Sequence, residues 1–398
     1  EVVYVGFGVH APEVGYSDYD DVDVEGKIVA MFGNAPATLP SEERAFYSSG
    51  RTKAEEAVRR GAIGMIGLRS RRIDEFYPWE RVKAQAGTRP GMAWVTLTGD
   101  PADYYPEIVG SALISTEVAR QLFAGTPITF EEARDATASS TPASVPLGFE
   151  VTLGRTTTHE VITSPNVVGV VPGTDPELKN EYVVLTAHMD HVGVGRPVDG
   201  DSIYNGADDD ASGTVTIIEL AQAFAALPEA PRRSMVFMTV SGEEKGLLGS
   251  GWYADHPTFP LAQTVANLNM DMVGRNWTDT IVAIGKEEST LGPLVERVSE
   301  EHPELDMAVI DDIWPEEGFY SRSDHYNFAR NGVPVLFFFN GTHDDYHKPS
   351  DHADRIAYDK MSRIGRLVFY TGYEVANADD RPAWDAAAYG RVVEQASE

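Results

Sequence analysis

The sequence contains no cysteine, which excludes disulfide bonds, thiolate metal ligands and a cysteine nucleophile. Any bound metal must therefore be held by histidine, aspartate or glutamate. Long hydrophobic runs are also lacking. The longest, Val333 to Phe339, is interrupted by Pro334 and fits a buried strand, so no membrane span is expected. The chain opens on EVVYVGFGV, without the pattern of a secretory signal peptide, and we expect a processed or trimmed product.

Basic residues are scarce relative to acidic ones. The 398 residues include 62 aspartates and glutamates but only 32 lysines and arginines, which gives a formal net charge of −30. Such a balance repels phosphate backbones, so we exclude nucleic acid as a partner. The length exceeds that of one ordinary compact domain, and two domains are expected.

A stretch rich in Ser, Thr, Ala and Pro, near residues 134–150, separates two regions of different character. We therefore divide the chain into a first domain, residues 1–148, and a second domain, residues 149–398. The first domain holds the strand-like runs EVVYVGFGV, GKIVAMFG and AIGMIGL and the helical run RTKAEEAVRRG. Its only histidine is His10, and no cluster of metal ligands is visible there.

Strands and helices alternate in the second domain. The strand-like runs are EYVVLTA, SMVFMTV, TVANLNM, TIVAIG and VPVLFFF, and the main helical runs are GTVTIIELAQAFAAL, TLGPLVERVSEEH and KMSRIGRLVFYTGYEVAN. This rhythm predicts an α/β fold, with a mainly parallel mixed sheet sandwiched by helices. Ligands of such sheets bind beyond the carboxyl ends of the strands.

Acids and histidines gather where these strands end. They are His188 and Asp190 in AHMDHVG, Asp209 in NGADDDASGTV, Glu243 and Glu244 in SGEEKGLLGS, Asp271 in NMDMVG, and His347 in DDYHKPSD. Each motif alone has an ordinary interpretation as a polar loop or a helix start. Together at one sheet edge they require a cation, and nitrogen and oxygen ligands without sulfur suit zinc, manganese or cobalt.

On these motifs the chain, from about Phe149 to the last helix, resembles a family of zinc aminopeptidases that also contains glutamate carboxypeptidase and the glutaminyl cyclases. The first domain resembles, on EVVYVGFGV, GKIVAMFG and AEEAVRRGAIGMIGL, the protease-associated domain that many members carry as an insertion. The resemblance implies the zinc exopeptidase fold, with a smaller β-rich domain, and peptide substrates. It also implies a protein exported to the periplasm or the extracellular medium.

The resemblance further implies two zinc ions bridged by Asp209. His188 and Asp271 would complete one metal site, and Glu244 and His347 the other. A cis peptide bond would follow Asp209.

The remaining implied roles concern residues that do not bind metal. Glu243 would act as general base, Asp190 would hold the His188 ring by its second nitrogen, and Tyr346 would help to polarise the scissile carbonyl, although a loop tyrosine is more often a packing residue. Asp208 and Asp210 would support the site or cap the following helix.

Several assignments keep an alternative. Ser323 either caps a helix or serves the site, Arg322 lies at the cleft rim with or without a substrate role, and Asp351 either orients His347 or caps a turn. The acidic excess favours an aminopeptidase, because an acidic cleft suits a free ammonium. A carboxypeptidase or dipeptidase on the same metal core remains the alternative, and a non-catalytic binding protein is a remote one. The cations near the motifs stand singly, at Lys245, Arg275, Arg322 and Lys348.

Overall fold

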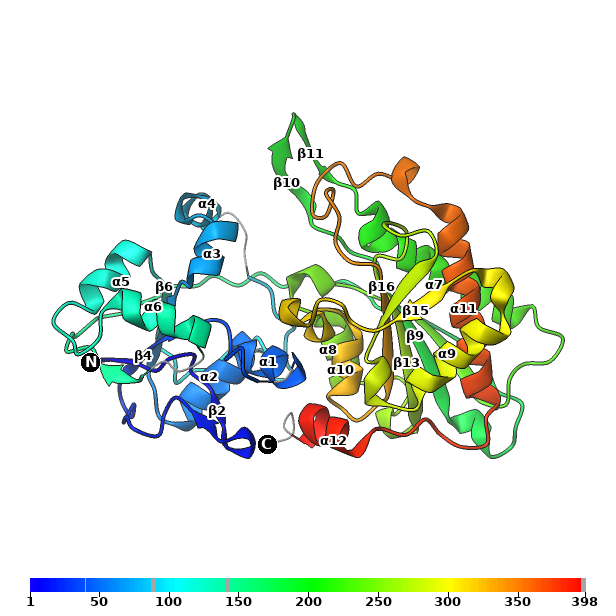
Figure 1. Cartoon of the computed structure of the whole chain (residues 1–398), viewed down its shortest axis with the longest axis horizontal. Coiled ribbons are helices and arrows are strands. Elements are labelled where there is room, and N and C mark those ends of the chain that lie inside the picture. Colours follow the sequence, from blue (N-terminus) through cyan, green and yellow to red (C-terminus); the bar gives the residue numbers. More distant parts are fainter. Residues whose placement is uncertain (40, 87–90, 103, 140–142, 395–398) are drawn as a thin grey trace. The chain divides into compact units, whose positions relative to one another are not determined.

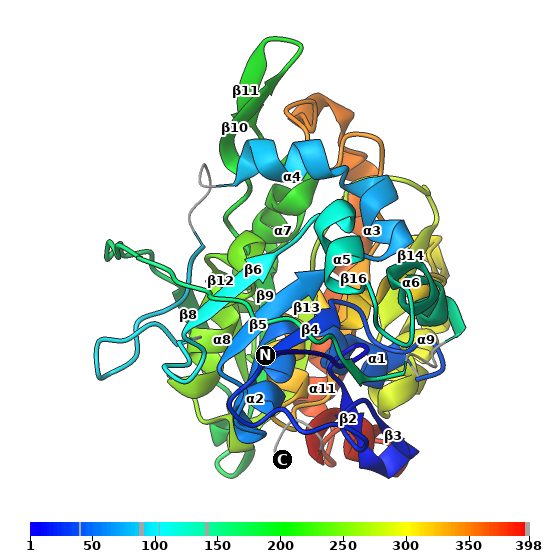
Figure 2. The same ribbon diagram turned by 90° about the vertical axis from the view of Figure 1, so that its left-hand side faces the viewer.

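The computed structural model describes residues 1–39, 41–86, 91–102, 104–139 and 143–394. The chain divides into two compact units, Glu1–Val161 and Ile162–Glu398, and Figures 1 and 2 allow each to be followed in two views. The predicted boundary after residue 148 therefore falls inside the first unit. The segment that follows it belongs there because the carbonyl of Phe149 accepts a hydrogen bond from Val2 N at 3.0 Å, and Leu153 packs against the same core.

The first unit is the smaller one and is built on a five-stranded sheet in the order β6-β5-β4-β1-β7. Strands β1, β4, β5 and β6 run parallel, and β7 is antiparallel to β1. The strands are β1 (Val2–Tyr4), β2 (His10–Ala11), β3 (Tyr16–Ser17), β4 (Ile28–Phe32), β5 (Gly64–Leu68), β6 (Gly110–Leu113) and β7 (Val145–Pro146). The helices are α1 (Ser41–Ser48), α2 (Gly50–Arg59), α3 (Arg71–Phe76), α4 (Trp79–Gln85), α5 (Thr116–Leu122) and α6 (Phe130–Ser139).

The second unit contains a seven-stranded sheet in the order β15-β14-β16-β13-β9-β12-β8. The central strands β12, β9, β13 and β16 are mutually parallel, whereas β8 and β14 pair antiparallel with their neighbours β12 and β16. The strands are β8 (Val167–Val171), β9 (Tyr182–His188), β12 (Ser234–Val240), β13 (Thr264–Met270), β14 (Thr280–Ile284), β15 (Ala308–Ile310) and β16 (Val335–Phe339), with a separate hairpin of β10 (Gly193–Val198) and β11 (Asp201–Tyr204).

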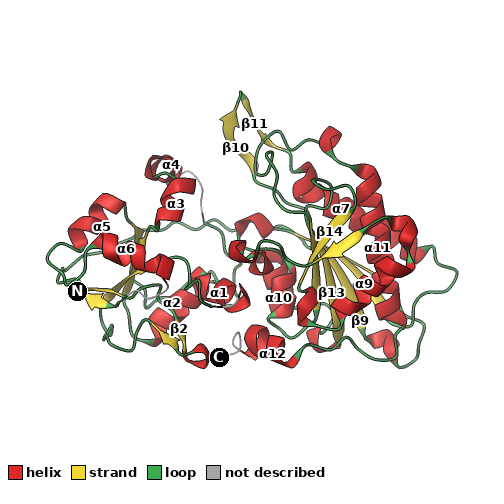
Figure 3. Ribbon diagram, viewed as in Figure 1, coloured by secondary structure: helices red, strands yellow, loops and turns green. Residues whose placement is uncertain are grey.

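Helices cover both faces of this sheet (Figure 3). Strand β9 shows why: Val183 and Leu185 enter one hydrophobic core, and Val184 between them enters the other. Successive side chains of a strand point to opposite faces, so a strand with apolar residues on both faces must be covered on both. The helices are α7 (Gly213–Ala225), α8 (Leu248–Asp255), α9 (Leu291–Glu301), α10 (His325–Ala329), α11 (Tyr358–Asn377) and α12 (Ala386–Tyr389). The predicted mainly parallel α/β sheet between helices is confirmed.

The long helices lie close to their predicted ranges, α7 for residues 213–227, α9 for 290–302 and α11 for 360–377. None of the helices in the described residues is both long and apolar enough to cross a bilayer.

Candidate metal centre

The candidate residues lie at one edge of the sheet in the second unit. His188 is the last residue of β9, and Asp271 directly follows β13. Glu243 and Glu244 lie in the turn after β12, and His347 lies in the loop after β16. These four strands are parallel, so their carboxyl ends share one edge, where ligands of open α/β sheets bind.

Asp209 lies between two histidines. Its Oδ1 is 3.3 Å from Nε2 of His188, and its Oδ2 is 3.2 Å from Nε2 of His347. Nε2 of His188 also lies 3.6 Å from Oδ1 of Asp271, and Nε2 of His347 lies 3.2 Å from Oε2 of Glu244. The five predicted ligands therefore form two clusters that share the Asp209 carboxylate.

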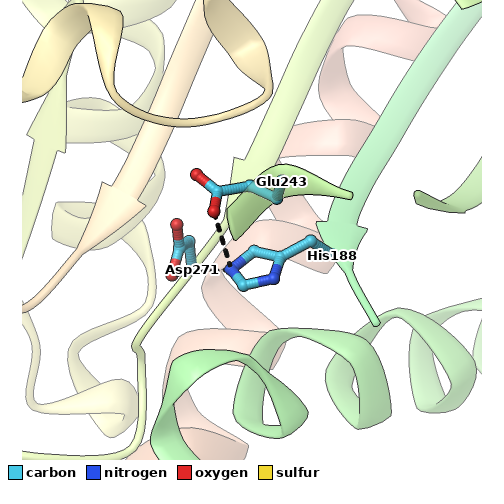
Figure 4. A group of neighbouring side chains, drawn as sticks. All are labelled: His188, Glu243 and Asp271. Atoms are coloured by element: carbon cyan, nitrogen blue, oxygen red, sulfur yellow. Dashed lines mark ion pairs between the residues drawn. The ribbon is translucent and has the colours of Figure 1, made fainter. Parts of the chain in front are cut away.

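Glu243 joins the first of these clusters. Its Oε2 lies 4.0 Å from Nε2 of His188, and its side chain points toward His188 and Asp271 (Figure 4). Burial raises the pKa of the Glu243 carboxyl well above its usual range, and the charge of Asp271 raises it further. Burial also acts to raise the pKa of Glu244, but hydrogen bonds with His191 and His347 lower it to about 2. The pKa values of these two adjacent glutamates are thus shifted in opposite directions.

His191 belongs to the second cluster and was not predicted from the sequence. Its Nδ1 lies 2.8 Å from Oε1 of Glu244 and 3.8 Å from Oδ2 of Asp209. The three side chains could together hold a metal ion. The sequence signal that could have revealed it is its position three residues after His188, in the motif AHMDHVG.

Asp190 acts on the site differently from the prediction. The second nitrogen of His188, Nδ1, lies 2.9 Å from the main-chain carbonyl of Asp190 but 3.9 Å from its carboxylate. The carboxylate instead accepts hydrogen bonds from the main-chain N–H groups of Gly242, Glu243 and Glu244 at 2.7, 3.1 and 3.3 Å. These N–H groups converge at a tight turn, and the carboxylate turns toward them, which leaves it beyond hydrogen-bonding distance of the imidazole. Asp190 therefore orients His188 through its backbone and the two glutamates through its side chain.

The acids that flank Asp209 fix the backbone around it. Asp210 accepts from the N–H groups of His188 at 3.2 Å and Gly213 at 2.9 Å, which joins the end of β9 to the start of α7. Asp208 accepts from Gly274 N at 2.6 Å, and Asp351 accepts from the N–H groups of Asp208 and Asp209. Asp351 thus caps the turn that carries Asp209.

The small residues around the three aspartates allow a close approach to the sheet. A Cβ atom on Gly213 would lie 2.4 Å from the carbonyl oxygen of Met270, and Gly206 has a φ of 63°. Neither position accepts a larger residue without a shift of the backbone. The peptide bond between Asp209 and Asp210 is cis, as the resemblance implied.

A cavity of about 50 Å³ opens beside the clusters. Tyr346 lines it, with its ring stacked on that of His347 at 3.9 Å between centroids. Burial raises the pKa of the Tyr346 hydroxyl, so this side chain remains a proton donor in hydrogen bonds. Ser323 donates to Oδ2 of Asp271 at 2.8 Å, which gives it a contact with the site, and Arg322 also lines the cavity. The described lining residues are Asp209, Glu243, Glu244, Asp271, Met272, Phe319, Arg322, Phe337, Phe339, Thr342, Tyr346 and His347.

The donor set fits a metal ion. Nε2 of His188 and Oδ1 of Asp271 are buried, and neither has a hydrogen-bond partner in the described part of the chain. Burial lowers the pKa of His347, but hydrogen bonds with Asp209 and Glu244 raise it to about 9. The clustered carboxylates therefore attract protons onto the histidines, and a divalent cation would neutralise the same charge.

The fold and these clusters together define an α/β protein with a candidate metal centre at the carboxyl edge of its sheet. Residues 166–372 match the model of Peptidase family M28. The match covers more than half of the chain, which therefore belongs to this family.

Individual relatives agree with this placement. Aminopeptidase YwaD of Bacillus subtilis (strain 168) is 28% identical over 229 residues, which cover 55% of this chain and 46% of that protein. Leucine aminopeptidase 1 of Coccidioides posadasii (strain C735) is 30% identical over 230 residues, 54% of this chain and 56% of that protein. The chain thus spans about half the length of the curated relatives it matches.

A solved structure also matches. The aminopeptidase from Aneurinibacillus sp. strain AM-1 aligns over 96% of this chain and 75% of that one, with a TM-score of 0.54 and 22% identity. The two chains share a fold.

Proposed function

We propose that the chain is a two-zinc exopeptidase that removes N-terminal residues from peptides. The observation that carries this proposal is the position of Asp209, whose carboxylate oxygens face His188 and His347 at 3.3 and 3.2 Å. A carboxylate in this position can bind two cations at once, one through each oxygen. Family membership supports the proposal, as do the names of the curated relatives, an aminopeptidase and a leucine aminopeptidase.

The proposed ligands divide into two sets. His188, Asp271 and one oxygen of Asp209 would hold one zinc ion, and His347, Glu244 and the other oxygen of Asp209 would hold the second. When bound, the ions supply Lewis-acid chemistry and lower the pKa of water. These histidines and carboxylates are donor types that zinc accepts in catalytic sites.

Glu243 is the proposed general base. Its carboxyl lies beside His188, and burial raises its pKa, which strengthens it as a proton acceptor near neutral pH. It would take a proton from the attacking water and deliver it to the leaving amine. Tyr346, stacked on His347, would donate a hydrogen bond to the oxygen of the scissile carbonyl.

The charge of the cavity favours an N-terminal direction of attack. Four carboxylates line it, those of Asp209, Glu243, Glu244 and Asp271. A free ammonium is the substrate group that such a lining attracts. A carboxypeptidase or dipeptidase on the same metal core is the second candidate, because Arg322 also lines the cavity.

We further propose that the first unit is a protease-associated domain that influences substrate range without supplying metal ligands. Both groups of metal-capable side chains among the described residues lie in the second unit. Export to the periplasm or the medium is part of the same proposal, and fractionation of cells that express the full gene would test it.

A matched panel of substrates tests the activity. We expect leucyl arylamide and unblocked peptides to be hydrolysed, chelation to abolish hydrolysis, and zinc to restore it. Acetylation of the N-terminus should lower kcat/KM at least about tenfold, which equals about 1.4 kcal/mol. Faster cleavage of acetylated peptides with a free C-terminus would reverse the direction of attack, and full activity of metal-free protein would refute the metal centre.

A further inference from the structure

Arg322 is the only arginine or lysine among the described residues that line the cavity. Two of the other cations near the motifs are engaged elsewhere. Arg275 pairs with Asp345 at 3.0 Å, and Lys348 donates to the carbonyl of Asp344 at 2.5 Å. Arg322 thus brings a single fixed positive charge to a cavity lined mainly by carboxylates and aromatic rings.

The aromatic wall holds the guanidinium in place. Its carbon lies 4.6 Å from the centre of the Phe319 ring, and that ring packs against Phe339 at 4.7 Å between centroids. The main chain is held as well. Arg322 N donates to Phe319 O at 2.9 Å, and the neighbouring Ser323 donates to Asp271 of the candidate metal centre. The side chain therefore starts from a backbone position that is tied to the reacting centre.

Most N–H donors of this guanidinium are available to a ligand. Its hydrogen bond to the carbonyl of Glu317 is long, at 3.5 Å. No carboxylate among the described side chains forms an ion pair with it, and the residue is exposed. A guanidinium presents several donors in a planar fork that matches a carboxylate, and stacking on an aromatic ring leaves the edge of that fork free.

We propose that Arg322 binds a carboxylate of the substrate, so that peptides with a carboxylate close to the scissile bond are preferred. The inference rests on the proposed function. In a dipeptide, the terminal carboxylate carbon is three bonds from the scissile carbonyl carbon, about 4 Å when extended. The side-chain carboxylate of an N-terminal aspartate is also three bonds away. Arg322 and Glu243 line the same cavity, so both arrangements are tested.

Two substrate pairs separate these sources. Leu-Ala is compared with Leu-Ala amide for the terminal carboxylate, and Asp-Ala amide with Asn-Ala amide for the side chain. We expect wild-type protein to favour the acid of at least one pair by about tenfold in kcat/KM, the scale of one charge-assisted hydrogen bond. Arg322→Met should remove this preference by raising KM for the acid alone, and Arg322→Lys should restore part of it.

The control is Lys348→Met, which removes a positive charge from the loop of His347 without altering the cavity lining. It should leave the preference intact. A change confined to one pair supports the proposal and identifies the source of the carboxylate. Equal preferences in wild type and Arg322→Met for both pairs would overturn it.

Binding to zinc-loaded Glu243→Gln, measured by calorimetry, gives a second readout that needs no turnover. Arg322→Met in this background should weaken binding of the favoured acid by about tenfold and leave its amide unaffected. If the wild-type protein cleaved none of these peptides, the proposed function would fail. The binding comparison would still decide the role of Arg322. Equal binding of the acid to Glu243→Gln with and without Arg322→Met would reject the proposed role.

Discussion

The carboxylate of Asp190 holds the main chain of Glu243, whose N–H group donates to Asp190 Oδ1 at 3.1 Å. The same carboxylate accepts from the N–H groups of Gly242 and Glu244 at 2.7 and 3.3 Å. Consecutive N–H groups that point the same way attract a negative charge. A residue just after β9 thus fixes the turn after β12, and with it the proposed base and a proposed ligand.

Asp190→Asn should slow turnover without removing zinc. The amide retains one oxygen, but its NH2 group cannot accept from the remaining N–H, so the turn loses about 1–3 kcal/mol and the orientation of Glu243 loosens. We expect kcat to fall at least about tenfold, since misplaced catalytic groups cost that much or more. Steady-state kinetics and zinc analysis would measure this.

Asp175→Asn is the matched control, because Asp175 accepts from the N–H groups of Glu177 and Leu178 at 2.9 and 3.1 Å in a turn outside the site. It should leave kcat unchanged. Wild-type turnover in Asp190→Asn would show that its carboxylate does not position the base.

The adjacent glutamates should give different defects when each is neutralised. Glu243→Gln should slow turnover by at least about 10²-fold, the usual scale for a general base, with zinc still bound. Glu244→Gln should weaken zinc binding, because this carboxylate faces His347 at 3.2 Å and has a pKa of about 2. Zinc analysis after dialysis, together with kcat, separates the two effects. Near wild-type turnover in Glu243→Gln would assign the base elsewhere.

Zinc affinity should rise with pH between about 6.5 and 8.5. The hydrogen bonds that the His347 ring donates to Asp209 and Glu244 overcome burial and raise the pKa of His347 to about 9, so in this range the imidazole of metal-free protein is protonated. Zinc must displace that proton, and its affinity increases about tenfold per pH unit for each proton released. Competition with a chelator at several pH values measures the slope. A pH-independent affinity would contradict the raised pKa.

The sequence predicted the elements that periodicity defines well. Strands β9, β12, β13 and β16 carry apolar residues on both faces, because helices cover both, and each ends at a polar motif. Their parallel order at one sheet edge follows from the βαβ rhythm. Short elements such as β15 (Ala308–Ile310) and the β10–β11 hairpin were not predicted, because an element of a few residues is too short to show a distinct hydrophobic period.

Side-chain direction was harder to predict than location. His191 lies as close to the aspartate and glutamate of its cluster as a ligand would, yet one histidine in a loop carries no periodic pattern. The carboxylate of Asp190 turned toward main-chain N–H groups of a strand neighbour, a contact between segments distant in sequence. The roles of the five proposed ligands and of Glu243 stay predictions that the variants above test.

A buried chain of hydrogen bonds runs through the sheet to Asp271. Asn267 donates to Thr186 at 2.9 Å, and Thr186 donates to Asn269 at 2.6 Å. Asn269 then donates to Ser323 at 2.9 Å, and Ser323 donates to Oδ2 of Asp271 at 2.8 Å. Each hydroxyl accepts one bond and donates the next, so the chain has one direction. Its last member determines which oxygen of Asp271 remains available to face His188.

The two hydroxyls of this chain should therefore differ when removed. Ser323→Ala takes away the donor to Asp271, and zinc affinity should fall about 10–100-fold, the usual effect of losing a partner of a metal ligand. Thr186→Val preserves shape but leaves the Asn269 carbonyl unsatisfied, which should cost about 1–3 kcal/mol of unfolding free energy with zinc affinity nearly unchanged. Chelator competition and urea unfolding of the metal-free variants measure the two quantities. Equal losses of zinc affinity in both variants would mean that the whole chain, rather than Ser323 alone, sets the orientation of Asp271.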